Sequence, residues 1–101
     1  MNIIAHEQEG VRKIIVQDLD KKSSIKDLLS YLSVDTKIEI NFLNIQIIPR
    51  SIVLKLQEIK ENVTIFTNES TLKSYLMNLG FDLKYHNNYE DKFNLVTSNP
   101  S

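Results

Sequence analysis

The sequence predicts a single α/β domain: a mainly parallel or mixed sheet of four to five strands, an N-terminal hairpin and about three helices. Three observations support this. Two β-rich stretches, residues 2–6 and 11–17, flank a polar turn at residues 7–10 that contains Gly10. From residue 38 to residue 85, strand-like and helix-like stretches alternate. The order β-β-α-β-α-β-α-β, joined by short loops, favours right-handed crossovers and a parallel sheet with the first strand antiparallel at an edge.

The first helix and the strand after it follow from apolar spacing. Ser24 is the expected N-cap of the helix, with Asp27 three residues later as its capping-box partner. The apolar positions recur at i, i+3, i+4 and i+7, and they are Ile25, Leu28, Leu29 and Leu32. Residues 38–42 alternate between apolar and polar side chains, which predicts a strand with one buried face.

The second and third helices have equally clear signals. Pro49 suits the first turn of the second helix, where a missing N–H is harmless. Thr67 or Asn68, after a β-rich stretch at residues 63–67, is the expected N-cap of the third helix. Gly80 and Phe81 then predict a Schellman turn at its end. The inward stripes are Ile52, Val53, Leu56 and Ile59 in the second helix, and Leu72, Tyr75, Leu76 and Leu79 in the third.

Composition excludes several classes of function. The chain has 101 residues, a formal net charge of −1 and no cysteine. We therefore expect no nucleic-acid binding, no attraction to an anionic membrane, no disulfide and no Cys-ligated zinc. With two glycines in the chain, no phosphate-binding glycine loop can form. No signal peptide or membrane span is recognisable, so the expected location is the cytoplasm.

The remaining chemistry-bearing residues are expected to be structural or solvated. His6 and His86 are interpreted as surface or edge-strand residues, not as metal ligands, and Asp18 and Asp20 as part of a solvated loop. We accordingly expect no catalytic residue, no metal and no cofactor. The domain is expected to span residues 1–86. Residues 87–101 are expected to form a polar, partly disordered tail in which three apolar residues could dock, namely Phe93, Leu95 and Val96.

From about residue 3 to residue 85 the chain resembles a STAS domain, the fold of bacterial anti-sigma factor antagonists and of the cytoplasmic tails of sulfate transporters. The resemblance rests on the opening hairpin, on the strand that leads directly into the second helix, and on the ending VTIFTNESTLKSYLMNLGFDLKY. In that ending, the helix of the family closes in a glycine and a hydrophobic residue. The matching positions here are Leu72, Tyr75, Leu76, Leu79, Gly80 and Phe81.

The chain departs from this family at the turn before the second helix. There, the antagonists carry an Asp-Ser-Ser/Thr-Gly motif whose hydroxyl is phosphorylated by a partner kinase. The corresponding stretch here reads Ile47-Ile48-Pro49-Arg50-Ser51, without the Asp or the Gly. A phosphoserine at a helix N-terminus is electrostatically favourable, so Ser51 is a candidate for phosphorylation. The alternative is that Ser51 is an ordinary residue of the first helical turn.

The same turn is the candidate binding surface. The predicted partner-binding residues are Ile48, Pro49, Arg50, Ser51 and Lys55. If Ile48 points outward, the turn presents an apolar patch beside Arg50, and such patches mark interaction sites. If both isoleucines at 47 and 48 point inward, they simply fill the core beneath the second helix.

We therefore expect a non-catalytic regulatory protein–protein interaction module. The resemblance implies a partner such as a kinase-type anti-sigma factor or a subunit of a regulatory complex. The alternative is a domain of the same fold that binds a small molecule, either a nucleotide or a lipid. Homodimerisation through the edge strand at residues 2–6 is also open, because such a strand leaves one row of backbone groups unpaired.

Overall fold

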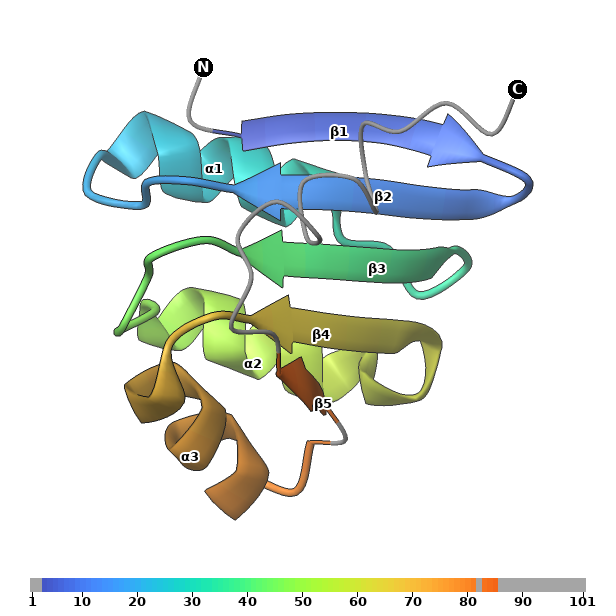
Figure 1. The fold of residues 1–101 in the computed structure, drawn as a ribbon. Coiled ribbons are helices and arrows are strands. Elements are labelled where there is room, and N and C mark those ends of the chain that lie inside the picture. Colours follow the sequence, from blue (N-terminus) through green and yellow to red (C-terminus); the bar gives the residue numbers. More distant parts are fainter. Residues whose placement is uncertain (1–2, 82, 86–101) are drawn as a thin grey trace.

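The computed structural model describes residues 3–81 and 83–85, which form one α/β domain with a mixed sheet and three α-helices (Figure 1). The order of strands and helices predicted from the sequence is confirmed. A single turn of 3-10 helix at Lys60–Asn62 is added before the fourth strand. The elements are β1 (Ile3–Gln8), β2 (Val11–Val16), α1 (Lys22–Tyr31), β3 (Lys37–Phe42), α2 (Arg50–Glu58), β4 (Val63–Thr67), α3 (Ser70–Asn78) and β5 (Leu83–Tyr85).

The strands lie in the sheet in the order in which they occur in the chain. β1 is antiparallel to β2, and the neighbours from β2 to β5 are parallel. The hairpin turn is shorter than the sequence suggested, because β1 continues to Gln8 and leaves two residues in the turn. Glu9 and Gly10 both have positive φ, 55° and 80°. This is the pattern of a type I′ turn, whose twist matches that of the two strands.

One face of the sheet forms the main core. Parallel register aligns Ile14 of β2 with Ile40 of β3 and Ile40 with Ile65 of β4, and all three side chains have no solvent exposure. Residues of all three helices pack against this row, among them Leu28, Leu56 and Leu76. The apolar spacing that predicted the helices therefore also identified the faces that α1 and α2 bury, and part of the face that α3 buries.

The beginning of α1 differs from the prediction. Lys21 holds the N-cap position without a side-chain cap bond, and Ser24 lies inside the helix as a buried residue. At the other end of α1, Arg12 of β2 donates a hydrogen bond to the carbonyl oxygen of Tyr31 at 2.7 Å and pairs with Glu7 at 2.7 Å. The guanidinium group of Arg12 thus satisfies one of the free carbonyl groups at the C-terminus of α1.

The beginning of α3 also corrects the sequence analysis. Glu69 is the N-cap residue, and Thr67 instead accepts a hydrogen bond from the Glu69 N–H through Oγ1 at 3.0 Å. Neither Thr67 nor Asn68 caps the helix. Tyr75, which was assigned to the inward stripe, is 47% exposed. Among the residues of α3, Leu72 and Leu76 alone are fully buried. The helix therefore contacts the core through a narrower face than the sequence predicted.

The predicted Schellman turn at the end of α3 is confirmed. Gly80 has φ +88°, its N–H donates to the Met77 carbonyl at 2.9 Å, and the Phe81 N–H donates to the Leu76 carbonyl at 3.1 Å. Phe81 is buried, and the ammonium group of Lys60 lies 5.3 Å from the centre of its ring. Within the described residues, no helix combines the length and the apolar character needed to cross a membrane.

The first prediction concerns Gly80. An alanine at this position would have to adopt an unfavourable positive φ, and its Cβ atom would lie 2.8 Å from the Lys60 Nζ. We expect Gly80→Ala to lower the free energy of unfolding by about 1–2 kcal/mol, measured by urea denaturation.

Gly10→Ala is the matched control, because Gly10 also has positive φ but nothing lies within 4 Å of the added Cβ. The Lys60 Nζ is the far end of a flexible side chain and can move away, so the positive φ determines most of the loss, and we expect Gly10→Ala to lose a similar amount. A Gly80→Ala variant as stable as the wild type would contradict the assignment of the turn.

Candidate functional site

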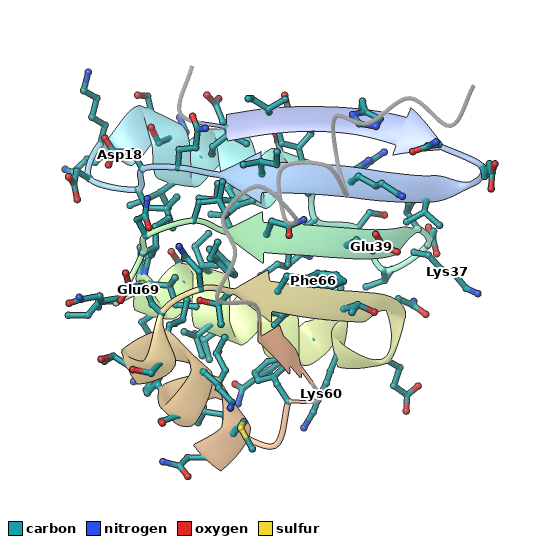
Figure 2. The ribbon with its side chains drawn as sticks, in the orientation of Figure 1. Asp18, Lys37, Glu39, Lys60, Phe66 and Glu69 are labelled. Atoms are coloured by element: carbon teal, nitrogen blue, oxygen red, sulfur yellow. The ribbon has the colours of Figure 1, made fainter. Side chains whose placement is uncertain are left out.

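The carboxyl ends of the parallel strands β2, β3 and β4 meet at one edge of the sheet. The loops that leave this edge lead into α1, α2 and α3. Figure 2 shows Asp18 and Glu69 at this edge, whereas Lys37, at the start of β3, lies at the opposite edge. In open α/β sheets, ligands and partners dock mostly at the carboxyl ends of the strands.

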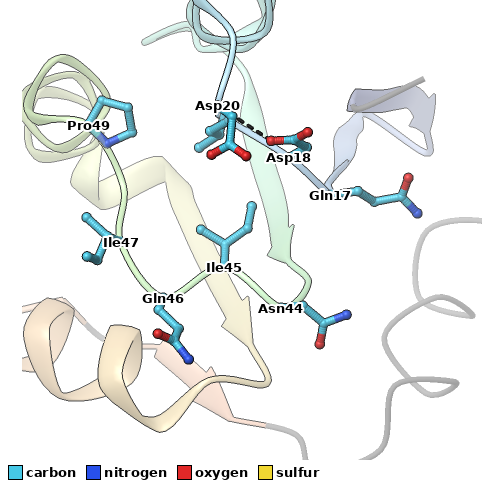
Figure 3. A pocket seen from close by; sticks show the side chains of 9 residues that line it. Gln17, Asp18, Asp20, Asn44, Ile45, Gln46, Ile47 and Pro49 are labelled. Carbon is cyan, nitrogen blue, oxygen red and sulfur yellow. Dashed lines mark hydrogen bonds between the residues drawn. The ribbon is translucent and has the colours of Figure 1, made fainter.

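An open cleft of about 700 Å³ lies between the β2–α1 loop and the β3–α2 segment. Figure 3 shows residues 44–49 along one wall, with the segment at residues 17–20 facing them. Among the described residues, two carboxylate side chains and no basic residue line the cleft. The lining residues are Gln17, Asp18, Leu19, Asp20, Asn44, Ile45, Gln46, Ile47 and Pro49.

The β3–α2 segment is fixed to its neighbour by an asparagine pair. Asn44 has φ +59°, a left-handed conformation that asparagine tolerates better than most residues. Its N–H donates to the Asn68 Oδ1 at 2.8 Å, and the Asn68 Nδ2 donates to the Asn44 Oδ1 at 2.8 Å. A further bond joins the Gln46 Nε2 to the Glu69 Oε1 at 3.3 Å. The segment is therefore held in one position relative to β4.

The opposite wall is a solvated loop with local order. The Asp20 N–H donates to the Asp18 Oδ1 at 2.8 Å, which is the hydrogen bond of an Asx turn. In the described part of the chain, no group of three His, Cys, Asp or Glu residues is arranged to hold a metal ion. His6 lies on the edge strand β1, and His86 lies outside the described residues. The cleft thus offers hydrogen-bond acceptors and negative charge to a ligand.

The last three residues before α2 and the first two residues of the helix, residues 47–51, are called the α2 corner below. The sequence left two alternatives open, an outward-pointing Ile48 or two isoleucines that both fill the core, and neither is correct as stated. Ile48 is 5% exposed and belongs to the core, whereas Ile47 is 81% exposed. Ile48 therefore cannot supply the exposed apolar side chain of the corner, and Ile47 takes that place. Pro49 precedes the helix, and its carbonyl oxygen accepts hydrogen bonds from the N–H groups of Ile52 and Val53.

The other three predicted partner-binding residues lie on α2 itself. Arg50 and Ser51 are the first two residues of the helix and are exposed. Lys55 is half-buried and pairs with Glu58 at 3.4 Å. The sequence analysis missed Leu54, which is 52% exposed and lies three residues after Ser51 on the outer face of the helix. Its position outside the inward stripe of α2 was the signal that could have revealed it.

Comparison of the chain with protein-family models, with curated proteins and with solved structures finds no match.

The second prediction concerns the asparagine pair. Asn68→Ala removes both hydrogen bonds to Asn44 and should lower the free energy of unfolding by about 1 kcal/mol, measured by urea denaturation. Asn44→Gly is the matched control, because glycine accepts the positive φ and keeps the N–H that donates to Asn68. We expect a smaller loss for Asn44→Gly. A larger loss for the control than for Asn68→Ala would contradict this account of the pair.

Proposed function

We propose that this chain is a non-catalytic regulatory module that binds another protein through the α2 corner and the outer face of α2. The observation that carries the proposal is the exposure of Ile47, at 81%, next to a helix that exposes Leu54, at 52%. Exposed apolar side chains that lie together mark interaction surfaces more often than reactive ones. Arg50 and Ser51 lie between these two residues in the chain, and both are exposed, so they are available for polar contacts with a partner.

The geometry of the corner favours binding with a small entropic cost. The asparagine pair holds the loop that carries Ile47, and the carbonyl of Pro49 starts the helix that carries Leu54. A surface that is already ordered loses little conformational freedom when it binds, so more of the contact energy contributes to affinity. Arginine beside an apolar anchor is also a frequent combination at the centre of protein interfaces.

The sequence resemblance to STAS domains supports the same surface. In the anti-sigma factor antagonists of that family, the turn before the second helix is the regulated contact. By that analogy, the partner is a kinase-type anti-sigma factor or a subunit of a regulatory complex, and the exposed Ser51 hydroxyl is a candidate for phosphorylation. A phosphate there would lie at the N-terminus of α2, next to Arg50, where negative charge is favourable. The chain would bind constitutively if Ser51 is not modified.

The third prediction tests the surface by affinity capture from the source cells, followed by titration of the purified partner. Ile47→Asp and Arg50→Glu should each weaken partner binding at least about tenfold. The first variant places a charge in an apolar contact, and the second reverses the charge beside that contact. The thermal midpoint should change little, since both side chains are exposed in the free chain.

Val34→Asp is the matched control, because Val34 is a 48% exposed apolar residue just before β3, at the other end of the sheet. It should leave binding unchanged. If the partner binds Ile47→Asp and wild type equally, or if Val34→Asp weakens binding as much, the α2 corner is not the interface.

A second candidate function, small-molecule binding, is favoured by the cleft of about 700 Å³ beside the corner. The two aspartates in its lining favour a neutral or cationic polar ligand over a nucleotide phosphate. Of the two ligand classes expected from the sequence, this chemistry disfavours a nucleotide and leaves a lipid with a neutral or cationic head group.

The fourth prediction distinguishes the two candidates by thermal shift. A ligand of the cleft should raise the midpoint of the wild type in proportion to the logarithm of its concentration, and should do so less for Asp18→Asn. If neutral and cationic metabolites, nucleotides and lipids all leave the midpoint unchanged, the second candidate is excluded for those ligand classes. Stabilisation by a nucleotide would contradict the charge argument.

A further inference from the structure

The α2 corner and the loop that faces it form one continuous surface around the cleft. Ile45 and Ile47 line the cleft from the β3–α2 segment, and Asp18 and Asp20 line it from the loop before α1. Figure 3 shows Ile45 pointing toward that loop, so an apolar side chain and two carboxylates face the same space. A partner that contacts the exposed Ile47 therefore meets the negative charge of the loop as well.

The two carboxylates are not neutralised by the described part of the chain. None of the ion pairs within the described residues includes Asp18 or Asp20. Lys21 and Lys22, the next two residues of the chain, are exposed and do not line the cleft. The Asp20 N–H occupies one acceptor site of Asp18, whereas an ionised carboxylate has about four such sites. Most of the acceptor capacity of the loop thus stays available to a donor from outside.

The facing wall of the cleft uses its donors within the chain. The Asn44 N–H donates to the Asn68 Oδ1, and the Gln46 Nε2 donates to the Glu69 Oε1. The second of these bonds also brings the carboxylate of Glu69 next to the cleft, where it adds to the negative charge. The polar groups around the cleft therefore favour a ligand that donates hydrogen bonds and carries positive charge.

The helix dipoles do not reverse this charge. The N-termini of α1 and α2 lie at the same edge of the sheet, and each is equivalent to roughly half a positive elementary charge. Asp18 and Asp20 supply two full negative charges. Arg50 is exposed at the first position of α2 but does not line the cleft. The cleft therefore remains negative, with the positive charge of Arg50 outside it.

The arrangement fits a segment of polypeptide better than a small molecule. The cleft, at about 700 Å³, falls within the range of roughly 300–1,000 Å³ that is typical of ligand pockets. A ligand confined to this space would not cover Leu54, which is 52% exposed and does not line the cleft. A segment that continues from the cleft over the α2 corner covers both Ile47 and the outer face of α2.

We propose that the cleft receives an arginine or a lysine of the partner, carried on an extended segment whose neighbouring apolar residue packs against Ile47. An acidic residue of the same segment then meets Arg50. The pairing of the cation with Asp18 and Asp20 sets the position of the segment, and the apolar contact supplies most of the affinity. This inference rests on the proposed function, because the segment belongs to the protein that binds the α2 corner, and it names the chemistry of that partner.

The test selects peptides from a random phage-displayed library on the immobilised full chain. The enriched peptides should share an arginine or a lysine close to a large apolar residue. Selection on the Asp18→Asn, Asp20→Asn double variant should lose the enrichment of basic residues, because the negative charge is removed. Asparagine at position 18 still accepts the hydrogen bond from the N–H of residue 20, so the loop retains its turn.

Asp35→Asn is the matched control, because Asp35 is an exposed carboxylate just before β3, at the opposite edge of the sheet. It should leave the enrichment of basic residues unchanged. The thermal midpoint of each variant, compared with that of the wild type, checks that the variant is folded.

An enriched peptide is then synthesised, and its dissociation constant is measured by fluorescence anisotropy. The double variant should raise the constant at least about tenfold, because the cation loses both carboxylate partners. Ile47→Ala should raise it about fivefold, because an apolar contact is lost while the charge stays the same. A cation held by the carboxylates alone would bind Ile47→Ala as tightly as the wild type, and that result would overturn the extended segment.

Three other outcomes would overturn the inference. The first is the enrichment of acidic peptides that lose their binding to Arg50→Glu. The second is a basic peptide that binds the double variant as tightly as the wild type. The third is a folded wild type that enriches no peptide, since the α2 corner would then recognise a folded surface and not a segment. All three leave the proposed function in place, because titration of the purified partner with Ile47→Asp decides it separately.

Discussion

The parallel register of β2, β3 and β4 is the constraint on which the rest of the structure depends. It aligns Ile14, Ile40 and Ile65 into one fully buried row, and a slip of one residue in any strand would turn that strand's row to the opposite face. The same register brings the carboxyl ends of the three strands to one edge of the sheet. The cleft, the asparagine pair and the α2 corner all lie at that edge, so the core that stabilises the domain also positions its candidate site.

The short segment between β3 and α2 contributes both to the core and to the candidate site. Ile45 and Ile48 point into the core, while Gln46 and Ile47 are exposed. The left-handed conformation of Asn44 redirects the chain at the end of β3, and Asn68 holds it there. Ile47 is consequently exposed at a defined place on the surface, which is what the proposed docking role requires.

The features that could be predicted from the sequence are those determined by local periodicity and turn chemistry. The stripes of α1 and α2 and the Schellman turn at Gly80 follow from spacing and from one glycine. What failed depends on contacts between distant residues. Ser24 resembles an N-cap, but α1 begins two residues earlier and buries it. Tyr75 fits the helical period of α3, but the core ends at Leu72 and Leu76.

The orientation of Ile47 and Ile48 could not be deduced for the same reason. It depends on the hydrogen bonds between Asn44 and Asn68, which are 24 residues apart. Asn41 was equally misleading, because its polarity placed it on the more polar side of β3, whereas its side chain is buried. These are the positions where burial and local pattern disagree.

Hydrogen–deuterium exchange of the full chain, free and bound to its purified partner, tests the central claim most directly. The α2 corner account predicts that binding slows exchange at residues 45–54 and leaves β1 and the turn at residues 9–10 unchanged. Slower exchange confined to β1 or to the loop before β3, with no change at residues 45–54, would contradict it.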